Sequence, residues 1–80
     1  MKEKRLLMQI IQFQLRQDED FIPLMQLLKA VNVVYSGSEA AHLITSGQVL
    51  RNGTVETRKR AKITAGEEIC LLDCHISVTN

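Results

Sequence analysis

The first apolar residues of the chain recur at every second position. Between residues 9 and 16, Ile11, Phe13 and Leu15 alternate with glutamine and arginine. In an extended chain this spacing places the apolar side chains on one face and the polar ones on the other. The alternation predicts a half-buried strand over residues 9–16, followed by a polar turn over residues 16–20.

The period changes to that of a helix after residue 20. Four apolar residues follow at positions i, i+3, i+4 and i+7, namely Leu24, Leu27, Leu28 and Val31. This pattern predicts a helix within residues 21–34. Pro23 suits its first turn, where the missing N–H costs nothing, and Lys29 falls off the apolar face and is expected to be exposed.

A second helix is marked at both of its ends. Ser36, followed three residues later by Glu39, forms the pattern of a capping box. In that motif the hydroxyl accepts a hydrogen bond from a helix N–H and the carboxylate reaches back toward the cap. Gly47 is typical of a residue that ends a helix in the left-handed conformation. The buried side of this helix is expected to comprise Ala40, Leu43 and Ile44.

Beyond Gly47 the chain consists of short extended segments and turns. The strongest turn signal is Asn52-Gly53, which is typical of a two-residue β-hairpin. The charged residues 58–62 are expected to form a loop or an irregular strand. We predict strands over residues 49–51, 54–57, 67–72 and 75–78, with further turns at 65–66 and 73–74.

Together these elements predict an α+β fold in the order β-α-α-β-β-β-β. Two short helices would pack on one face of a small antiparallel sheet. A length of 80 residues suits one domain, residues 1–80, and a hydrophobic content of 45% with a net charge of +1 indicates a folded chain. Residues 1–8 precede the first strand pattern and are a candidate flexible segment.

The apolar runs predict where in the cell the protein is found, and the cysteines predict whether it binds a metal or has disulfides. No apolar run approaches the roughly 20 residues of a membrane span, and the N-terminus lacks the pattern of a signal peptide. The expected compartment is therefore the cytoplasm. Cys70 is expected in a buried strand and Cys74 in a turn, and two cysteines do not make a disulfide framework. With His75 they fit no common zinc spacing, so neither a metal nor another cofactor is expected.

The charge of the chain is concentrated in one stretch. Between residues 51 and 62 five cations oppose the single acid Glu56, which gives a local charge of +4. These cations are Arg51, Arg58, Lys59, Arg60 and Lys62. The concentration indicates a localised anionic partner. Residues 58–62, which we call the basic loop, carry four of the five and could engage about 3–5 phosphates.

The order of the motifs resembles a known family. They are Leu27-Leu28-Lys29, Ser36-Gly37-Ser38-Glu39-Ala40, Leu43-Ile44, Gly47, Val49, Asn52-Gly53, Glu56-Thr57-Arg58, Lys62 and Gly66-Glu67. Over about residues 11–79 the chain is similar to the S-four-type RNA-binding domain, and in particular to its free-standing bacterial version. That domain takes its name from the fourth protein of the small ribosomal subunit. The resemblance implies the alpha-L RNA-binding motif, without catalysis, and recognition of structured RNA, often ribosomal RNA or a ribosomal particle.

The resemblance also implies where RNA would bind. By position it implies contacts from the two-helix corner, the hairpin and the basic loop, while Ala41 stands where the family commonly has a lysine and Ser38 where it often has glycine. His42 can replace the missing charge only when protonated, and Arg51 offers another from the neighbouring strand. The candidate RNA contacts are Lys29, Ser36, Gly37, His42, Arg51, Asn52, Arg58, Lys59, Arg60 and Lys62.

Several of these residues have a structural interpretation as well. Ser36 is a helix cap and Asn52 a turn residue before either is an RNA contact. Tyr35 could stack on a base or ribose, but its place at the helix–helix turn favours a packing role. Phe13 and Phe21 fall where a core is expected. The shortage of exposed aromatic residues favours recognition of RNA shape and backbone over stacking of single-stranded bases.

Three other function classes compete with RNA binding as interpretations of this sequence. A protein-interaction adaptor for an acidic partner remains open because of the cation missing at Ala41. DNA binding by a helix-turn-helix is disfavoured because four of the ten residues 37–46 are Ala, Leu or Ile, whereas a recognition helix presents polar residues to the major groove. No catalytic residues are expected, since no acid, base or nucleophile pair has a recognisable spacing.

Overall fold

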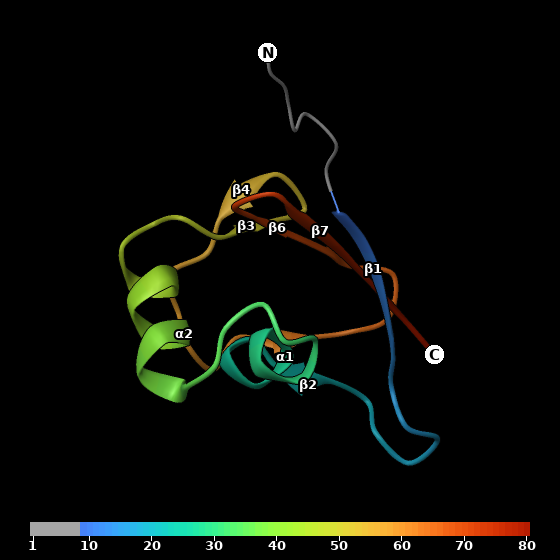
Figure 1. The fold of residues 1–80 in the computed structure, drawn as a ribbon. Coiled ribbons are helices and arrows are strands. Elements are labelled where there is room, and N and C mark those ends of the chain that lie inside the picture. Colours follow the sequence, from blue (N-terminus) through green and yellow to red (C-terminus); the bar gives the residue numbers. More distant parts are fainter. Residues whose placement is uncertain (1–8) are drawn as a thin grey trace.

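The computed structural model describes residues 9–80 of the chain, and its elements are labelled in Figure 1. The candidate flexible segment 1–8 lies outside the described residues. The helices are α1 (Leu24–Ala30) and α2 (Gly37–Thr45). The strands are β1 (Gln9–Gln14), β2 (Ile22–Pro23), β3 (Leu50–Arg51), β4 (Thr54–Val55), β5 (Lys62–Ile63), β6 (Glu68–Leu71) and β7 (Cys74–Thr79).

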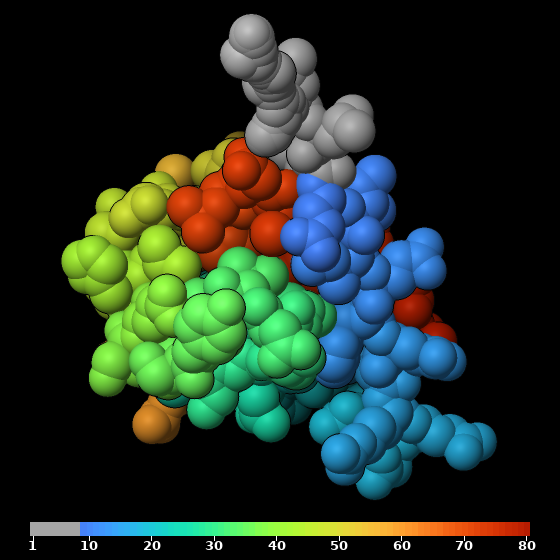
Figure 2. Space-filling view, viewed as in Figure 1, coloured from blue at the N-terminus to red at the C-terminus, as the bar shows by residue number. Residues whose placement is uncertain are grey.

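The predicted arrangement of two helices on one face of a sheet is confirmed. The main sheet has the strand order β1-β7-β6-β3-β4, and a second sheet pairs β2 with β5. Both helices lie on the same side of the main sheet (Figure 1). In the space-filling view the green atoms of the helices lie against the blue atoms of β1 and the red atoms of the C-terminal strands (Figure 2). Within residues 9–80, no helix is both long and apolar enough to cross a membrane.

The main sheet is mixed rather than antiparallel, which corrects the prediction. β1 pairs with β7 in the parallel direction, whereas the other strand pairs are antiparallel. The parallel register places Ile11 opposite Ile76 and Phe13 opposite Val78. Both apolar rows therefore face the core together. Alternation in the sequence decides which face of a strand is buried, but it does not specify the partner strand or its direction.

Helix α1 is shorter than predicted because both flanks take other structures. Ile22 and Pro23 pair with β5, so Pro23 precedes the helix in an extended conformation instead of lying in its first turn. At the other end Asn32 adopts a positive φ of 63°. The N–H of Asn32 donates to Lys29 and that of Val33 donates to Leu28, which closes a Schellman motif. An asparagine that can adopt the left-handed conformation was the signal for this helix end.

Helix α2 begins and ends as its sequence predicts. The N–H of Glu39 donates to Oγ of Ser36 at 3.1 Å, while Oε1 of Glu39 accepts from the N–H of Tyr35 at 2.9 Å. The carboxylate thus reaches back one residue beyond the cap. Gly47 has a φ of 83°, and its N–H and that of Gln48 close a second Schellman motif.

The turns of the second half follow the sequence with one shift. Asn52 and Gly53 have φ values of 51° and 87°, as a two-residue hairpin between β3 and β4 requires. The turn between β6 and β7 is Leu72-Asp73 rather than Asp73-Cys74, because Leu71 pairs with Cys74. This register brings Ile69 opposite Ile76 in the core.

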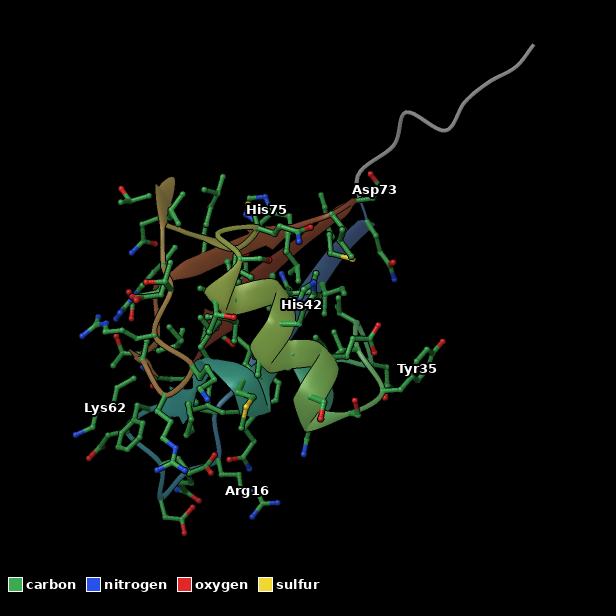
Figure 3. All side chains as sticks on the ribbon, turned by 90° about the vertical axis from the view of Figure 1, so that its left-hand side faces the viewer. Arg16, Tyr35, His42, Lys62, Asp73 and His75 are labelled. Carbon is green, nitrogen blue, oxygen red and sulfur yellow. The ribbon has the colours of Figure 1, made fainter. Side chains whose placement is uncertain are left out.

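The core lies between the helices and the sheet, and it departs from expectation at two aromatic residues. Among its fully buried side chains are Leu24, Leu27, Leu28, Ile44, Ile63, Ile69 and Ile76. Leu43 is only half-buried, and Phe13 packs at the edge of the core. Phe21, expected in the core, is exposed, and its ring lies 5.1 Å from Nζ of Lys62. Tyr35, expected to pack, has an exposed fraction of 92% because the helix–helix turn directs it away from both helices (Figure 3).

Candidate nucleic-acid interface

The basic loop is held in place by the start of helix α1. The N–H of Leu24 donates to the carbonyl of Ala61 and that of Met25 to the carbonyl of Lys59, both at 2.9 Å. These are two of the N–H groups that the first turn of a helix leaves without an intrahelical partner. The pairing of β2 with β5 fixes the loop further on, at Ile63. The loop is therefore anchored by its backbone, which leaves its charged side chains available to the surface.

Buried and exposed residues alternate at the end of the loop. Ala61 and Ile63 are buried, with exposed fractions of 4% and 0%, whereas Arg60 and Lys62 are exposed. Because successive side chains of an extended segment point to opposite sides, the burial of these two apolar residues directs the neighbouring cations outward. Figure 3 shows Lys62 extending outward on one side of α2.

The outward cations border a shallow cavity of about 400 Å³. Its lining consists of Arg51, Arg58, Arg60, Ala61 and Lys62. Four of these five residues carry positive charge, although the chain as a whole carries only +1. A concave surface lined by one sign of charge concentrates ions of the opposite sign. The geometry suits a phosphate or another compact anion.

Arg51, one of the candidate contacts, is engaged by protein groups on three sides. Its Nε and Nη2 donate to the two carboxylate oxygens of Glu67 at 2.6 and 2.9 Å. Nη1 donates to Glu56 at 3.1 Å, and Nη2 also donates to the carbonyl of Lys62 at 2.8 Å. The hydrogen bonds from Arg51 hold the pKa of Glu67 down at about 2. Two carboxylates thus neutralise this guanidinium, which gives Arg51 a structural role at the floor of the site.

Arg58 shares the second of these carboxylates but remains open to solvent. Oε2 of Glu56 accepts from Nε of Arg58 at 2.9 Å and from its backbone N–H at 3.2 Å, and Oε1 accepts from Nη2 at 3.1 Å. The Arg58 side chain is nevertheless 73% exposed, whereas Glu56 is buried and has an exposed fraction of only 8%. The hydrogen bonds from Arg58, ahead of those from Arg51, lower the pKa of Glu56 to about 2. Glu56 raises the pKa of Arg58 in turn.

The other three cations of the loop have no such partner. Lys59, Arg60 and Lys62 are exposed, and none forms an ion pair with a carboxylate of residues 9–80. Lys62 instead lies over the ring of Phe21, a cation–π contact that leaves its charge uncompensated. These three residues and the outer edge of Arg58 are the positive groups of the basic loop that an anion can reach.

Asn52, another candidate contact, is used by the fold. Its Oδ1 accepts from the N–H of Glu68 at 2.9 Å, and its Nδ2 donates to Oε1 of Glu67 at 3.1 Å. The side chain therefore ties the β3–β4 turn to the start of β6. This agrees with the primary expectation that Asn52 is a turn residue.

The helical candidates lie away from the cavity. Lys29 is exposed in the last turn of α1, while the basic loop contacts Leu24 and Met25 in the first turn, about 6–8 Å away along the helix axis. Ser36 and Gly37 begin α2, and Oγ of Ser36 is occupied by the N–H of Glu39. His42 is exposed on α2 between Tyr35 and Lys62, which extend outward on opposite sides of that helix (Figure 3). These four helical candidates are thus absent from the lining of the cavity.

Sequence reasoning missed the two carboxylates that organise the site. Glu56 entered the sequence argument as a negative charge, and both residues entered it as members of the family motifs, but neither was assigned a role in the site; yet each binds an arginine of the cavity. The available signal was a single acid within a run of cations, two residues before Arg58. Glu67 carried no such signal, because it lies sixteen residues from Arg51 in the chain.

The cysteines and histidines do not form a second site. Cys70 and Cys74 are unbridged thiols and are half-buried, with Cys74 in β7 rather than in a turn as expected. Nε2 of His75 lies 2.9 Å from Oε1 of Glu68. In the part of the chain that the structure describes, no three His, Cys, Asp or Glu side chains are grouped as metal ligands would be.

Comparison with known proteins places this geometry in a family. The S4 domain model, which is the S-four-type domain that the sequence resembles, matches residues 13–79. YbcJ of Escherichia coli (strain K12), named as a candidate RNA-binding protein, is 46% identical over 48 residues, 60% of this chain and 69% of the relative. YbcJ of Shigella flexneri matches to the same extent.

A solved structure supports the same placement. The solution structure of E. coli YbcJ, which contains an alpha-L motif involved in RNA binding, superposes with a TM-score of 0.70 at 34% identity. The match covers 96% of this chain and 95% of that one. The two helices on a mixed sheet therefore share the fold of E. coli YbcJ, and the chain belongs to the S4 domain family.

Proposed function

We propose that this chain is a non-catalytic module that binds structured RNA, with ribosomal RNA or a ribosomal particle as its partner. The observation that carries the proposal is the cavity lined by four cations at the start of α1. In a chain with a net charge of +1, a cationic concavity of this kind is a local feature and not a consequence of general basicity.

The related proteins support the proposal. E. coli YbcJ contains an alpha-L motif involved in RNA binding and shares the fold along nearly its whole length. The 48-residue match to YbcJ at 46% identity is further evidence of common ancestry. Because fold alone does not specify function, the argument for RNA binding rests on the cavity as well as on the relationship.

The mode of binding follows from which groups are accessible. Lys59, Arg60 and Lys62 offer charge to phosphates, and Arg58 offers the outer edge of a guanidinium. Phe21 lies under Lys62, so the loop does not present an open ring for stacking. The loop is therefore suited to the backbone of a folded RNA, and the helical group at Lys29 and His42 would contact a second part of the same RNA.

A salt titration of RNA affinity tests the proposal. The purified protein is bound to hairpins from ribosomal RNA, with transfer RNA and duplex DNA of equal length as controls. If four phosphates are engaged, affinity falls by about two decades between 50 and 200 mM salt. Glutamine replacements at Lys59, Arg60 and Lys62 should each lower the magnitude of the log–log slope by about 0.9.

Arg16 provides a matched control for these replacements. It is an exposed cation in the β1–β2 loop, so Arg16→Gln makes the same change in net charge outside the cavity. We expect Arg16→Gln to leave the slope nearly unchanged. Equal effects from Arg16→Gln and Arg60→Gln, or equal affinity for duplex DNA and RNA, would argue against a specific site. Capture of an acidic protein that survives ribonuclease would point instead to a protein adaptor.

A further inference from the structure

The cationic cavity has a buried carboxylate beside it. Glu56 is the buried charged residue of the described chain, with an exposed fraction of 8%. By simple electrostatics a negative charge next to an anion site weakens binding. A carboxylate at this place must therefore favour anion binding in another way, and the hydrogen bonds that Glu56 forms with the arginines indicate how.

Both oxygens of Glu56 are occupied by the arginines of the cavity. Arg58 supplies its Nε, its Nη2 and its backbone N–H, at 2.9, 3.1 and 3.2 Å, and Arg51 supplies Nη1 at 3.1 Å. The fork of Arg58 therefore faces Glu56 along one edge. Nη1 of Arg58 has no hydrogen-bond partner within residues 9–80, and the residue lines the cavity.

An exposed arginine normally samples many rotamers, and ordering it on binding costs conformational entropy. Here two hydrogen bonds from the side chain of Arg58 to Glu56, and a third from the backbone N–H of Arg58 to the same carboxylate, fix the guanidinium before any ligand arrives. The direct repulsion from Glu56 is small, because its charge is already shared between two guanidinium groups. The entropy saved by ordering Arg58 in advance therefore outweighs the small repulsion between Glu56 and a bound anion.

We propose that Glu56 is a positioning residue for anion recognition, which orients Arg58 so that its outer edge binds a phosphate of the RNA in the cavity. This inference rests on the proposed function, and it adds that RNA binding requires a fixed orientation of the Arg58 guanidinium. Arg58 then presents a guanidinium whose orientation is fixed before binding. Lys59 and Lys62 supply point charges, and Arg60 supplies a guanidinium that no carboxylate orients.

The proposal predicts an effect opposite in sign to that of charge alone. Glu56→Gln makes the site more positive, so electrostatics predicts tighter RNA binding. Loss of positioning predicts weaker binding instead, by about 3–10-fold for one unordered arginine. Glu68→Gln is the matched control: it makes the same charge change, but the exposed carboxylate of Glu68 contacts His75 and no arginine of the cavity. We expect Glu68→Gln to bind at least as tightly as the wild type.

A double-mutant cycle assigns the effect to the pair. In an Arg58→Ala background, Glu56→Gln should no longer weaken binding of the ribosomal RNA hairpin. Arg58→Lys keeps the charge but loses the fork, and it should weaken binding about as much as Glu56→Gln. This second variant also decides the matter if Glu56→Gln fails to fold, since Glu56 keeps its contact with Arg51.

An NMR measurement follows Arg58 independently of RNA. In the wild type the Nε–H of Arg58 should exchange slowly with water, and in Glu56→Gln it should exchange fast. Tighter binding by Glu56→Gln, or unchanged binding by Arg58→Lys, would overturn the proposal. A wild type that does not bind structured RNA, although its Arg58 Nε–H is protected, would refute the proposed function and leave Glu56 a purely structural carboxylate.

Discussion

Arg51 on β3 and Glu67, sixteen residues later, are joined by two parallel hydrogen bonds, Nε to Oε1 at 2.6 Å and Nη2 to Oε2 at 2.9 Å. The same guanidinium reaches Glu56 and the carbonyl of Lys62. One side chain therefore connects the β3–β4 hairpin, the end of the basic loop and the turn before β6. The two-pronged geometry is one that lysine cannot reproduce. It fixes the floor of the cationic cavity.

Replacement of Arg51 should destabilise the fold. Arg51→Gln leaves the half-buried Glu67 without its main partner, and it leaves Glu56, which is only 8% exposed, with Arg58 alone. We expect the free energy of unfolding to fall by about 2–3 kcal/mol, since removing one member of a largely buried charge pair leaves the other uncompensated. Urea denaturation measures the change. Arg60→Gln, an exposed cation of the same cavity, should stay within about 0.5 kcal/mol; equal values for the two variants would contradict the structural role of Arg51.

The fold should lose stability in acid through Glu56 and Glu67. Both carboxyl groups have a pKa of about 2 in the folded chain, against an ordinary value of 4.5. A group whose pKa is lowered by folding stabilises the fold fully above its unfolded pKa and loses that contribution as the pH falls through the folded one. We therefore expect the urea midpoint to fall between about pH 4.5 and pH 2. Glu67→Gln should flatten this dependence, and a curve as steep as that of the wild type would be evidence against the assignment.

Asn52 offers a test that separates turn chemistry from RNA contact. Asn52→Ala removes the bonds to Glu67 and to the N–H of Glu68, and it places alanine at a φ of 51°. We expect a loss of about 1–3 kcal/mol in the free energy of unfolding. Asn52→Gly removes the same bonds but tolerates the positive φ, so it should cost less. If RNA affinity falls equally in both variants while only one is destabilised, Asn52 contacts RNA directly.

Replacing Tyr35 and replacing Leu27 should have very different effects on the free energy of unfolding. Tyr35 is 92% exposed, so Tyr35→Ala should change the free energy of unfolding by less than about 0.5 kcal/mol. Leu27 is fully buried, and Leu27→Ala should cost about 2–5 kcal/mol. Thermal or urea denaturation compares the two. A loss above 1 kcal/mol for Tyr35→Ala would restore the packing role, whereas weaker RNA binding at unchanged stability would place an RNA contact at the helix–helix turn.

Much of the local structure was determined by the sequence alone. The cap at Ser36, the end of α2 at Gly47 and the hairpin at Asn52-Gly53 appear where their residues predicted them. Each depends on interactions within about five residues, so short-range sequence carries the information. The concentration of cations in residues 58–62 was equally evident from the sequence, because it is a property of composition.

Tertiary structure alone decided the parallel pairing of β1 with β7, the exposure of Phe21 and Tyr35, and the roles of the charged residues. In the sequence the five cations from Arg51 to Lys62 are equivalent positive charges. In the fold, Glu67 neutralises Arg51 from sixteen residues away, and Glu56 orients two side chains at once. Electrostatic pairing depends on distance in space and on burial, and neither is encoded in a local pattern.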